Sequence, residues 1–414
     1  MIRSSQIEFD MFLPSSAIRS KPLLDRYSSD FTTKLRLKIR PYYHSVEAQD
    51  GPYVVVDGRR MLMMCSNEYL GLSSHPKIKK ATADAIQTWG TSPCGSRMAN
   101  GSRSYHQELE TVLADFFGME ACHVTSTGYL ACMAPLSTLV QRKDALLMDK
   151  SVHSSLWDGA LLGGANIERF NHENLTELES LLASLPEEQA KAIAVDGVYS
   201  MEGHIASLPQ IVEMAERHRA IVMVDDSHGI GVLGNEGRGT IDHHKMTGRV
   251  EVLTGSFSKS FASTGGFIAS SRAIIDYLRT HCRQIIFSAG LPPSQTAAAL
   301  AALRLMREEP EHRQRLLDNA AFYRAGLQEL GVNFWNSPSP GQPIVLGDKE
   351  KCYQVWSLLW EQGFFTTMVW SPAVAAGKEL IRTSVTALHT RDQIGLFLAA
   401  LGTALKKVGF TPAK

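Results

Sequence analysis

Residues Ala220–Gly231 read AIVMVDDSHGIG, and this stretch decides the fold class. An apolar run of strand length leads directly into Asp225, Asp226 and His228. A strand that is apolar along its whole length is typical of a parallel sheet covered on both faces. In open α/β sheets the ligand crevice lies at the carboxyl ends of the strands. The stretch therefore predicts one strand of such a sheet, with polar groups at the edge of a binding site.

Further apolar runs of strand length follow one another between about residue 60 and residue 295, with helical patterns between them. They read ACHVTS, DALLMD, ANIERF, KAIAVDGV and VEVLTGS. Strands that alternate with helices favour a largely parallel sheet with a helix layer on each face. We therefore expect an α/β protein with a mostly parallel central sheet covered by helices.

The chain is expected to divide into three segments. Residues 1–60 form an N-terminal arm and a hairpin, which the turn sequence DGRR indicates. Residues 61–300 form a large domain, and residues 301–414 form a smaller C-terminal α/β domain. A long helical stretch interrupted near Pro310 bridges the two domains. The last helix is expected to open at Thr390 with Gln393 three residues later, a capping-box pattern.

Composition and charge exclude several classes of protein. Lys plus Arg and Asp plus Glu number 42 each, and the basic residues form no stripe for nucleic acid or an anionic membrane. No apolar run approaches the ~20 residues of a membrane span, and Glu8 and Asp10 lie where a signal peptide needs an apolar stretch. The six cysteines are scattered singly, without metal-ligand spacing. We expect a cytoplasmic protein that binds no metal.

Two short motifs have ordinary explanations. Gly229–Gly234 reads GIGVLG, which matches the G-x-G-x-x-G of dinucleotide sites. Such a site needs its glycines to open a helix directly after the strand, and here DDSH intervenes. The DHH of Asp242–His244 suggests a metal cluster, but adjacent residues rarely share a face suited to one ion. Both segments are expected to be loops.

Two turns after strands carry small and hydroxyl residues. Thr125–Tyr129 reads TSTGY before a helical pattern, and helix N-terminal amides beside small residues form an anion site. Ser256–Ser260 reads SFSKS, so Ser256 and Ser258 flank Lys259. Pyridoxal phosphate (PLP) needs a lysine amine, a carboxylate beside its ring nitrogen and a phosphate anchor, and the chain offers all three. Each piece also fits an ordinary role, such as a loop lysine or an N-cap acid, and spacing alone leaves both interpretations open.

From about Tyr42 to the C-terminal helix the chain resembles the α-oxoamine synthase family of fold-type-I PLP enzymes. Motifs that occur in the family's order include CGSRMANGS, TSTGY, DGVYSMEG, GSFSKS and IFSAGLPPS. Within the family, the residues of these motifs are most similar to those of the bacterial serine palmitoyltransferase branch. The resemblance implies a fold-type-I transferase with a large PLP domain, a smaller C-terminal domain and an active site at a homodimer interface.

The resemblance also implies roles for individual residues. Lys259 is the Schiff-base lysine and the general base, Asp225 is the partner of the pyridinium nitrogen, and His228 bonds the ring hydroxyl. His153 stacks on the ring and is a candidate for orienting the substrate. The other residues expected to bind the cofactor are Ser126, Thr127, Gly128, Tyr129, Ser200, Ser256, Ser258 and, for the neighbouring subunit, Ser288.

On the substrate side, the resemblance implies that Arg382 holds the amino-acid carboxylate and that Asn67 lies nearby. The implied reaction is condensation of a small amino acid with a long-chain acyl thioester, with decarboxylation, to give an α-amino ketone, as in serine palmitoyltransferases of sphingolipid biosynthesis. Serine is favoured over glycine or alanine, and coenzyme A or a carrier protein delivers the acyl group. The alternatives are an 8-amino-7-oxononanoate synthase, an aminotransferase of the same fold, and a cofactor-free binding protein.

The sequence departs from the family's pattern at two places. Trp370 and Ser371 occupy a stretch where many members have Arg-Pro-Pro. Ser92 replaces the glycine that usually precedes CGSR. Both changes leave the cofactor residues intact, and they leave the identity of the substrate pair open.

Overall fold

The computed structural model describes residues 22–23, 41–371 and 373–411. Residues from Val46 onward form one compact unit. Most of the predicted N-terminal arm, including Glu8 and Asp10, lies outside the described residues. Within the described residues, no helix has both the length and the apolar composition that a membrane crossing requires.

In the described part of the chain, the central sheet has seven strands in the order β4-β10-β9-β8-β7-β5-β6. The pairs β5–β6, β5–β7, β7–β8 and β8–β9 are parallel, whereas β10 is antiparallel to both β4 and β9. The strands are β4 Ala121–Thr125, β5 Ala145–Asp149, β6 Asn166–Phe170, β7 Lys191–Asp196, β8 Ala220–Asp225, β9 Val252–Ser256 and β10 Gly266–Ser270. The mostly parallel sheet is confirmed; β10, which begins in a glycine pair, was not predicted.

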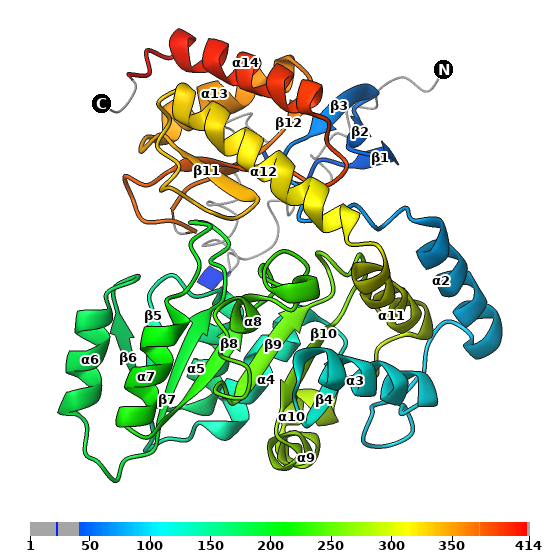
Figure 1. Cartoon of the computed structure of the whole chain (residues 1–414), viewed down its shortest axis with the longest axis vertical. Coiled ribbons are helices and arrows are strands. Elements are labelled where there is room, and N and C mark those ends of the chain that lie inside the picture. The colour runs from blue at the N-terminus through cyan, green and yellow to red at the C-terminus, as the bar shows by residue number, and fades with distance from the viewer. Residues whose placement is uncertain (1–21, 24–40, 372, 412–414) are drawn as a thin grey trace. The chain divides into compact units, whose positions relative to one another are not determined.

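The inner strands are mostly apolar because each face of the sheet contacts its own hydrophobic core, whereas the edge strand β6 carries polar and exposed residues. In β7, Ile193 and Val195 belong to one core, whereas Ala192 and Ala194 belong to the other. The first core includes α3 Ser104–Phe117, α6 Leu175–Ser184, α7 Leu208–Arg217 and α11 Pro293–Glu308, and the second includes α4 Gly128–Leu139, α5 Ser154–Gly163, α9 Arg272–His281 and α10 Arg283–Ile286. Figure 1 shows these helices around the sheet.

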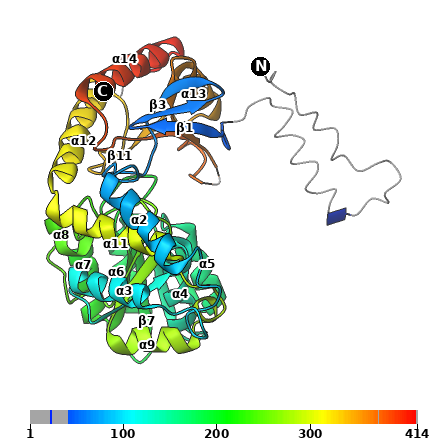
Figure 2. The same cartoon turned by 90° about the vertical axis from the view of Figure 1, so that its right-hand side faces the viewer.

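The C-terminal part is built on the antiparallel sheet β11-β14-β13. Its strands are β11 Gly341–Val345, β13 Thr367–Val369 and β14 Leu380–Ser384, and its helices are α12 Glu311–Glu329, α13 Lys349–Glu361 and α14 Arg391–Lys407. The helical bridge breaks as predicted, since α11 ends at Glu308 and Pro310 precedes α12. Helix α2, Pro76–Trp89, lies beside α11 in both views (Figures 1 and 2).

The predicted hairpin forms, and it pairs with the C-terminal part of the chain. Strands β2 Tyr53–Val56 and β3 Arg59–Met63 are antiparallel, and β1 Val46–Asp50 extends the sheet at β2. Asp57 (φ 51°) and Gly58 (φ 68°) adopt the positive φ that a two-residue hairpin turn requires. Strand β12, Phe364–Phe365, pairs in parallel with β3. The segment boundaries at residues 60 and 300 stay a prediction.

Two short helical segments, 3-10 helix η2 Asn235–Gly237 and α8 Thr240–His243, follow the loop after β8. Gly229–Gly234 precedes both segments and opens no helix that follows the strand directly.

The predicted capping box at the start of α14 is present. The Thr390 hydroxyl accepts a hydrogen bond from Gln393 N at 3.2 Å, and Gln393 Oε1 accepts one from Thr390 N at 2.9 Å. Thr390→Ala should therefore lower the free energy of unfolding by about 1 kcal/mol, measured by urea denaturation. The matched control is Thr403→Ala on the same helix, where the exposed hydroxyl only bonds back to Ala399 O. Equal losses in the two variants would contradict the capping role.

Candidate active site

A cavity of about 480 Å³ lies at the carboxyl ends of β7, β8 and β9. Twelve predicted site residues line it: Asn67, Thr127, Gly128, Tyr129, His153, Ser200, Asp225, His228, Ser256, Ser258, Lys259 and Arg382. A larger hollow of about 670 Å³ surrounds the ion pairs that the buried Glu110 forms with Arg97 and Arg279, and none of those twelve residues lines it. The smaller cavity is therefore the candidate active site.

Lys259 lies in the loop that follows β9. Its side chain reaches the cavity, but protein surrounds the amine on most sides, and this burial lowers the pKa of Lys259 even though the Asp225 carboxylate acts in the opposite direction. A lowered pKa increases the fraction of neutral, nucleophilic amine near neutral pH. The flanking hydroxyls Ser256 Oγ and Ser258 Oγ lie 2.7 Å apart.

Asp225 is the last residue of β8 and is buried. Its Oδ1 accepts hydrogen bonds from Ser227 Oγ at 2.6 Å and Ser227 N at 3.1 Å, which fixes the orientation of the carboxylate. His228 Nδ1 lies 2.7 Å from the Tyr69 hydroxyl. Burial, and then the charge of Lys259, hold the pKa of His228 well below its usual range, so this imidazole is neutral near pH 7.

Asp226 has a different environment from its neighbour Asp225. Its Oδ2 accepts a hydrogen bond from Thr240 N, and its Oδ1 accepts one from the Thr240 hydroxyl, both at 2.5 Å. Burial raises the pKa of Asp226 to about 7, although the bonds to Thr240 lower it. Asp226 does not line the cavity and instead anchors the loop that follows β8.

His153 is the N-cap of α5 and faces the cavity. Its Nδ1 accepts a hydrogen bond from Ser155 N at 3.3 Å and lies 2.7 Å from Ser155 Oγ. Its backbone N donates to both carboxylate oxygens of Asp196, each at 3.2 Å. Burial of the imidazole ring lowers the pKa of His153. The ring is therefore held in one orientation at the cavity wall.

The N-terminus of α4 forms an anion site beside Ser256. Thr127 is the N-cap, and its hydroxyl accepts a hydrogen bond from Leu130 N at 3.1 Å. A Cβ added to Gly128 would lie 2.5 Å from Ser256 Oγ, so only glycine fits at this position. Backbone amides at a helix start, close to the hydroxyls of Ser256 and Ser258, supply the donors that a phosphate group needs.

Arg382 lies on β14 and is buried. Its Nε donates to Ser200 O and its second terminal nitrogen donates to Asn67 Oδ1, each at 2.9 Å. Both of these partners are neutral, and among the described residues Arg382 has no ion pair. A buried guanidinium is costly without an anion, so the site is suited to a carboxylate supplied by a ligand.

Comparisons with known proteins agree with this geometry. The aminotransferase class I and II family model matches residues 59–401. Serine palmitoyltransferase of Sphingobacterium spiritivorum is 39% identical over 378 residues, which cover 91% of this chain and 95% of that protein. The 8-amino-7-oxononanoate synthase of Thermosipho melanesiensis is 38% identical over 368 residues, which cover 89% and 94% of the two chains. Both relatives are α-oxoamine synthases. This chain belongs to the α-oxoamine synthases.

The solved structures include a serine palmitoyltransferase variant from S. paucimobilis with bound PLP and myriocin. It superposes with a TM-score of 0.91 at 33% sequence identity, covering 94% of this chain and 100% of that chain. The fold is thus that of a fold-type-I PLP transferase, and the chain is a PLP-dependent acyltransferase.

The residues of the cavity fit PLP. The donors at the start of α4 match the phosphate, the fixed carboxylate of Asp225 matches a protonated ring nitrogen, and Lys259 supplies an amine of lowered pKa. When bound, PLP withdraws electrons from the Cα of an amino acid. The individual roles of the lining residues remain predictions.

Ser126 and Ser288 lie outside this cavity. Both line an adjacent hollow of about 530 Å³, together with Ser92, and Thr264 lines both spaces. The structure therefore does not bring these two serines to the other cofactor residues within one subunit. Trp370 also lies outside the cavity, because it packs against the hydrophobic core of the C-terminal part.

Several cavity residues were not predicted, and Asp196 is the most informative of them. It ends β7 directly beside Asp225 on β8, and burial, then the Asp225 charge, raise the pKa of Asp196 well above its usual value. The signal was the apolar run KAIAVD, which ends in an acid as AIVMVD does. Ser227 and Ser155 in the cavity, and Tyr69 outside its lining, had no such signal, because they act through contacts with Asp225, His153 and His228.

Gly128→Ala should weaken PLP binding by roughly tenfold, because overpacking typically costs about 1–3 kcal/mol and the added methyl would displace Ser256 or the start of α4. Equilibrium dialysis of PLP against the apoprotein measures the change. The control is Gly395→Ala, since a Cβ at Gly395 on α14 meets nothing within 4 Å. Wild-type PLP affinity in the Gly128 variant would show that the anion site lies elsewhere.

Proposed function

We propose that this enzyme condenses a small amino acid, with serine favoured, with a long-chain acyl thioester. A bond forms between the amino-acid Cα and the acyl carbonyl carbon, the thiol leaves, and the bond from Cα to the carboxylate breaks with release of CO2. The product is an α-amino ketone. The observation that carries the proposal is the buried Arg382, which has neutral partners and lines the same cavity as Lys259.

The cavity residues have complementary tasks in this reaction. Arg382 binds the amino-acid carboxylate with two parallel hydrogen bonds and so sets the orientation of the Cα bonds. Asn67 and Ser200 hold the guanidinium in place through their own bonds to it. The amine of Lys259, with its lowered pKa, removes the proton from Cα as a general base. His153 orients the carboxylate or the thioester carbonyl.

An apolar cluster beside the cavity supports an apolar acyl chain. Met201 lines the cavity and also packs against Val369, Val374 and Leu380. Burial of apolar surface is worth roughly 25 cal/mol per Å², so a long alkyl chain gains affinity with each methylene that it places against Met201 at the cavity wall. The same cluster includes Trp335, whose ring lies 5.8 Å from the Lys378 ammonium.

The proposal extends to the oligomeric state, the pathway and the location of the enzyme. We infer a homodimer in which Ser288 serves the neighbouring subunit's cofactor, and the 81% exposed side chain of Phe287 beside it supports a surface that another chain covers. A role in sphingolipid biosynthesis follows if serine and a long-chain thioester are the substrates. A cytoplasmic location rests on the sequence features above, and the six cysteines are free thiols.

The second candidate is 8-amino-7-oxononanoate synthase, because relatives of that name reach 38% identity. The name of that product implies alanine as the amino acid and a seven-carbon thioester that ends in a carboxylate. The two candidates therefore differ in both substrates, while the cavity chemistry is shared.

A matrix of amino acids against acyl thioesters tests the assignment. Serine with a long-chain acyl-CoA should give the highest kcat/KM, measured by thiol release, CO2 release and product mass together. Alanine with the seven-carbon dicarboxylic thioester should be at least tenfold slower. The reverse order would replace the first candidate with the second. Conversion of amino acid to keto acid without thiol release would indicate an aminotransferase.

Arg382→Gln should raise the KM for the amino acid by roughly 10–100-fold, because hydrogen bonds to charged groups contribute about 1.5–3 kcal/mol. The KM for the acyl thioester should change by less than about threefold, well below one charged hydrogen bond. Steady-state kinetics with each substrate varied in turn measure both. Arg304→Gln, which removes only an exposed ion pair with Glu108, is the control. An unchanged amino-acid KM in the Arg382 variant would contradict the carboxylate-binding role.

A further inference from the structure

Two histidines and a glutamate meet outside the active-site cavity. His172 and Glu173 lie in the turn between β6 and α6, and His204 lies in the loop that follows β7. His172 Nε2 lies 3.0 Å from His204 Nδ1, and Glu173 Oε2 also lies 3.0 Å from His204 Nδ1. The two imidazole planes are within 5° of parallel. Three potential ligand atoms therefore converge on one point.

The outer nitrogen of His172 is bound by a carboxylate. Asp149, at the end of β5, is buried and accepts hydrogen bonds from Ser151 N at 2.8 Å and Glu173 N at 3.2 Å. Both of its oxygens lie 3.1 Å from His172 Nδ1. Because the carboxylate accepts, Nδ1 of His172 carries the hydrogen and donates it. The Nε2 lone pair of neutral His172 is therefore directed at His204.

The outer nitrogen of His204 is bound by a backbone carbonyl. His204 Nε2 lies 2.8 Å from Trp335 O, which can only accept. Nε2 therefore carries the hydrogen. In the neutral ring Nδ1 has a lone pair that faces two further acceptors, His172 Nε2 and the Glu173 carboxylate, so a proton or a metal ion must lie between the three atoms. In this tautomer pair, two imidazole lone pairs and one carboxylate oxygen face each other, an arrangement that a shared cation stabilises.

The surrounding charge favours a cation as well. The charged groups that act on His172 are Asp149, Glu202 and Glu173, all of them acidic. The side chain of Glu173 is 44% exposed, and those of His172 and His204 are 18% and 20% exposed, so the cluster is open to ions from solvent. Two imidazole nitrogens and one carboxylate oxygen form a set that zinc uses in sites with an open fourth position.

We propose that His172 Nε2, His204 Nδ1 and Glu173 Oε2 bind a divalent metal ion of the zinc type, with water as the fourth ligand. Zinc–nitrogen bonds of about 2.0–2.1 Å in tetrahedral geometry separate two ligand atoms by about 3.3 Å. The 3.0 Å separation of the histidine nitrogens needs to open by only a few tenths of an ångström. Asp149 and the Trp335 carbonyl are the outer partners that orient metal-binding histidines.

The ion would tie a loop of the active site to the β6–α6 turn. Tyr199 N donates to His204 O at 3.0 Å, and Gly203 N donates to Tyr199 O at 2.8 Å, so Tyr199–His204 is a tight loop. Ser200 in this loop lines the cavity and accepts a hydrogen bond from Arg382. None of the three ligands lines the cavity, so the ion has a structural task.

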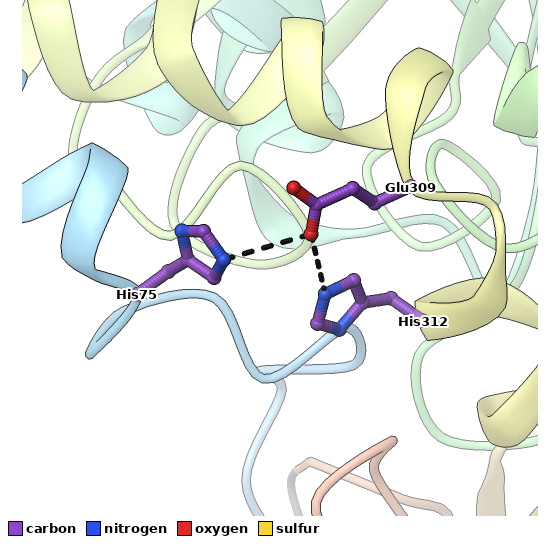
Figure 3. A group of neighbouring side chains, drawn as sticks. All are labelled: His75, Glu309 and His312. Atoms are coloured by element: carbon purple, nitrogen blue, oxygen red, sulfur yellow. Dashed lines mark hydrogen bonds and ion pairs between the residues drawn. The ribbon is translucent and has the colours of Figure 1, made fainter.

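A second cluster, formed by His75, Glu309 and His312, serves as the matched control (Figure 3). Its hydrogen bonds run in the opposite direction. Its outer nitrogens accept instead of donating: His75 Nδ1 accepts from Lys77 N at 3.3 Å, and His312 Nδ1 faces the Arg315 guanidinium at 2.9 Å. The Nε2 atoms therefore carry hydrogens directed at Glu309. The Lys77 ammonium, 2.6 Å from Glu309, already neutralises this carboxylate.

The test uses PLP-loaded enzyme that has been treated with a chelator and desalted. Isothermal titration with Zn²⁺ should give one site per chain, zinc should raise the melting temperature, and Co²⁺ should give the visible absorption of a tetrahedral site. Glu173→Gln and Asp149→Asn should each weaken Zn²⁺ binding by roughly 10–100-fold, as partial loss of a metal site does. His204→Gln should abolish binding, while His312→Gln should bind as the wild type does.

Glu173→Gln is the variant least expected to disturb folding, because the Glu173 side chain is the most exposed of the three ligands. The PLP content of each variant shows whether it has folded. No one-to-one Zn²⁺ binding by the wild-type enzyme would overturn the proposal and leave the two histidines sharing a proton. Loss of binding in His312→Gln with retention in His204→Gln would overturn it too.

Discussion

The parallel pairing of β8 with β9 is the constraint on which the active site depends. Asp225 pairs with Thr254 in this register, so the acid and the loop that carries Lys259 leave the sheet at the same edge. The neighbouring strand β7 adds Asp196 at the same level as Asp225. The sheet is covered on both faces, so these groups cannot turn toward water and are held in the cavity. The lowered pKa of Lys259 and the raised pKa of Asp196 both follow first from this burial.

A second constraint is that Arg382 reaches the cavity from the C-terminal part of the chain, whereas most of the other lining residues come from the central sheet and its loops. Arg382 on β14 is bound by Asn67 and by Ser200, residues from three separate segments. Strand β12 pairs with β3, so the hairpin and the C-terminal part share a sheet. Arg382 lies in the neighbouring sheet β11-β14-β13, and movement of that sheet relative to the central one would displace Arg382 from Ser200 O. In the proposed reaction, the amino-acid carboxylate bound to Arg382 would help to hold the two parts together.

Much of the fold was predictable because its signals are local. Six strands of the central sheet, the Asp57–Gly58 turn and the Thr390 capping box each follow from periodicity or turn chemistry over fewer than ten residues. Strand β10 was missed because its glycine pair is typical of a loop, and its stability comes from antiparallel pairing with β4 and β9. The sequence predicted that Asp226 lies at the binding site together with Asp225. Successive residues of a strand point in opposite directions, and the motif alone does not show which of the two acids faces the cavity.

The sequence by itself determined the α/β class, the family and its PLP cofactor, and it predicted the roles of Lys259 and Asp225, because each of these rests on short motifs and on their order along the chain. Only the tertiary structure decided that Asp225 Oδ1 accepts the hydrogen bonds of Ser227 and that Ser126 and Ser288 lie in an adjacent hollow. It also decided that Arg382 bonds to two neutral partners, Ser200 and Asn67, which are 182 and 315 residues away in the sequence. The same holds for His172 and His204, which are 32 residues apart and meet through two loops. Contacts of this kind depend on how the strands are ordered in the sheet, and that order is set by packing and not by local sequence.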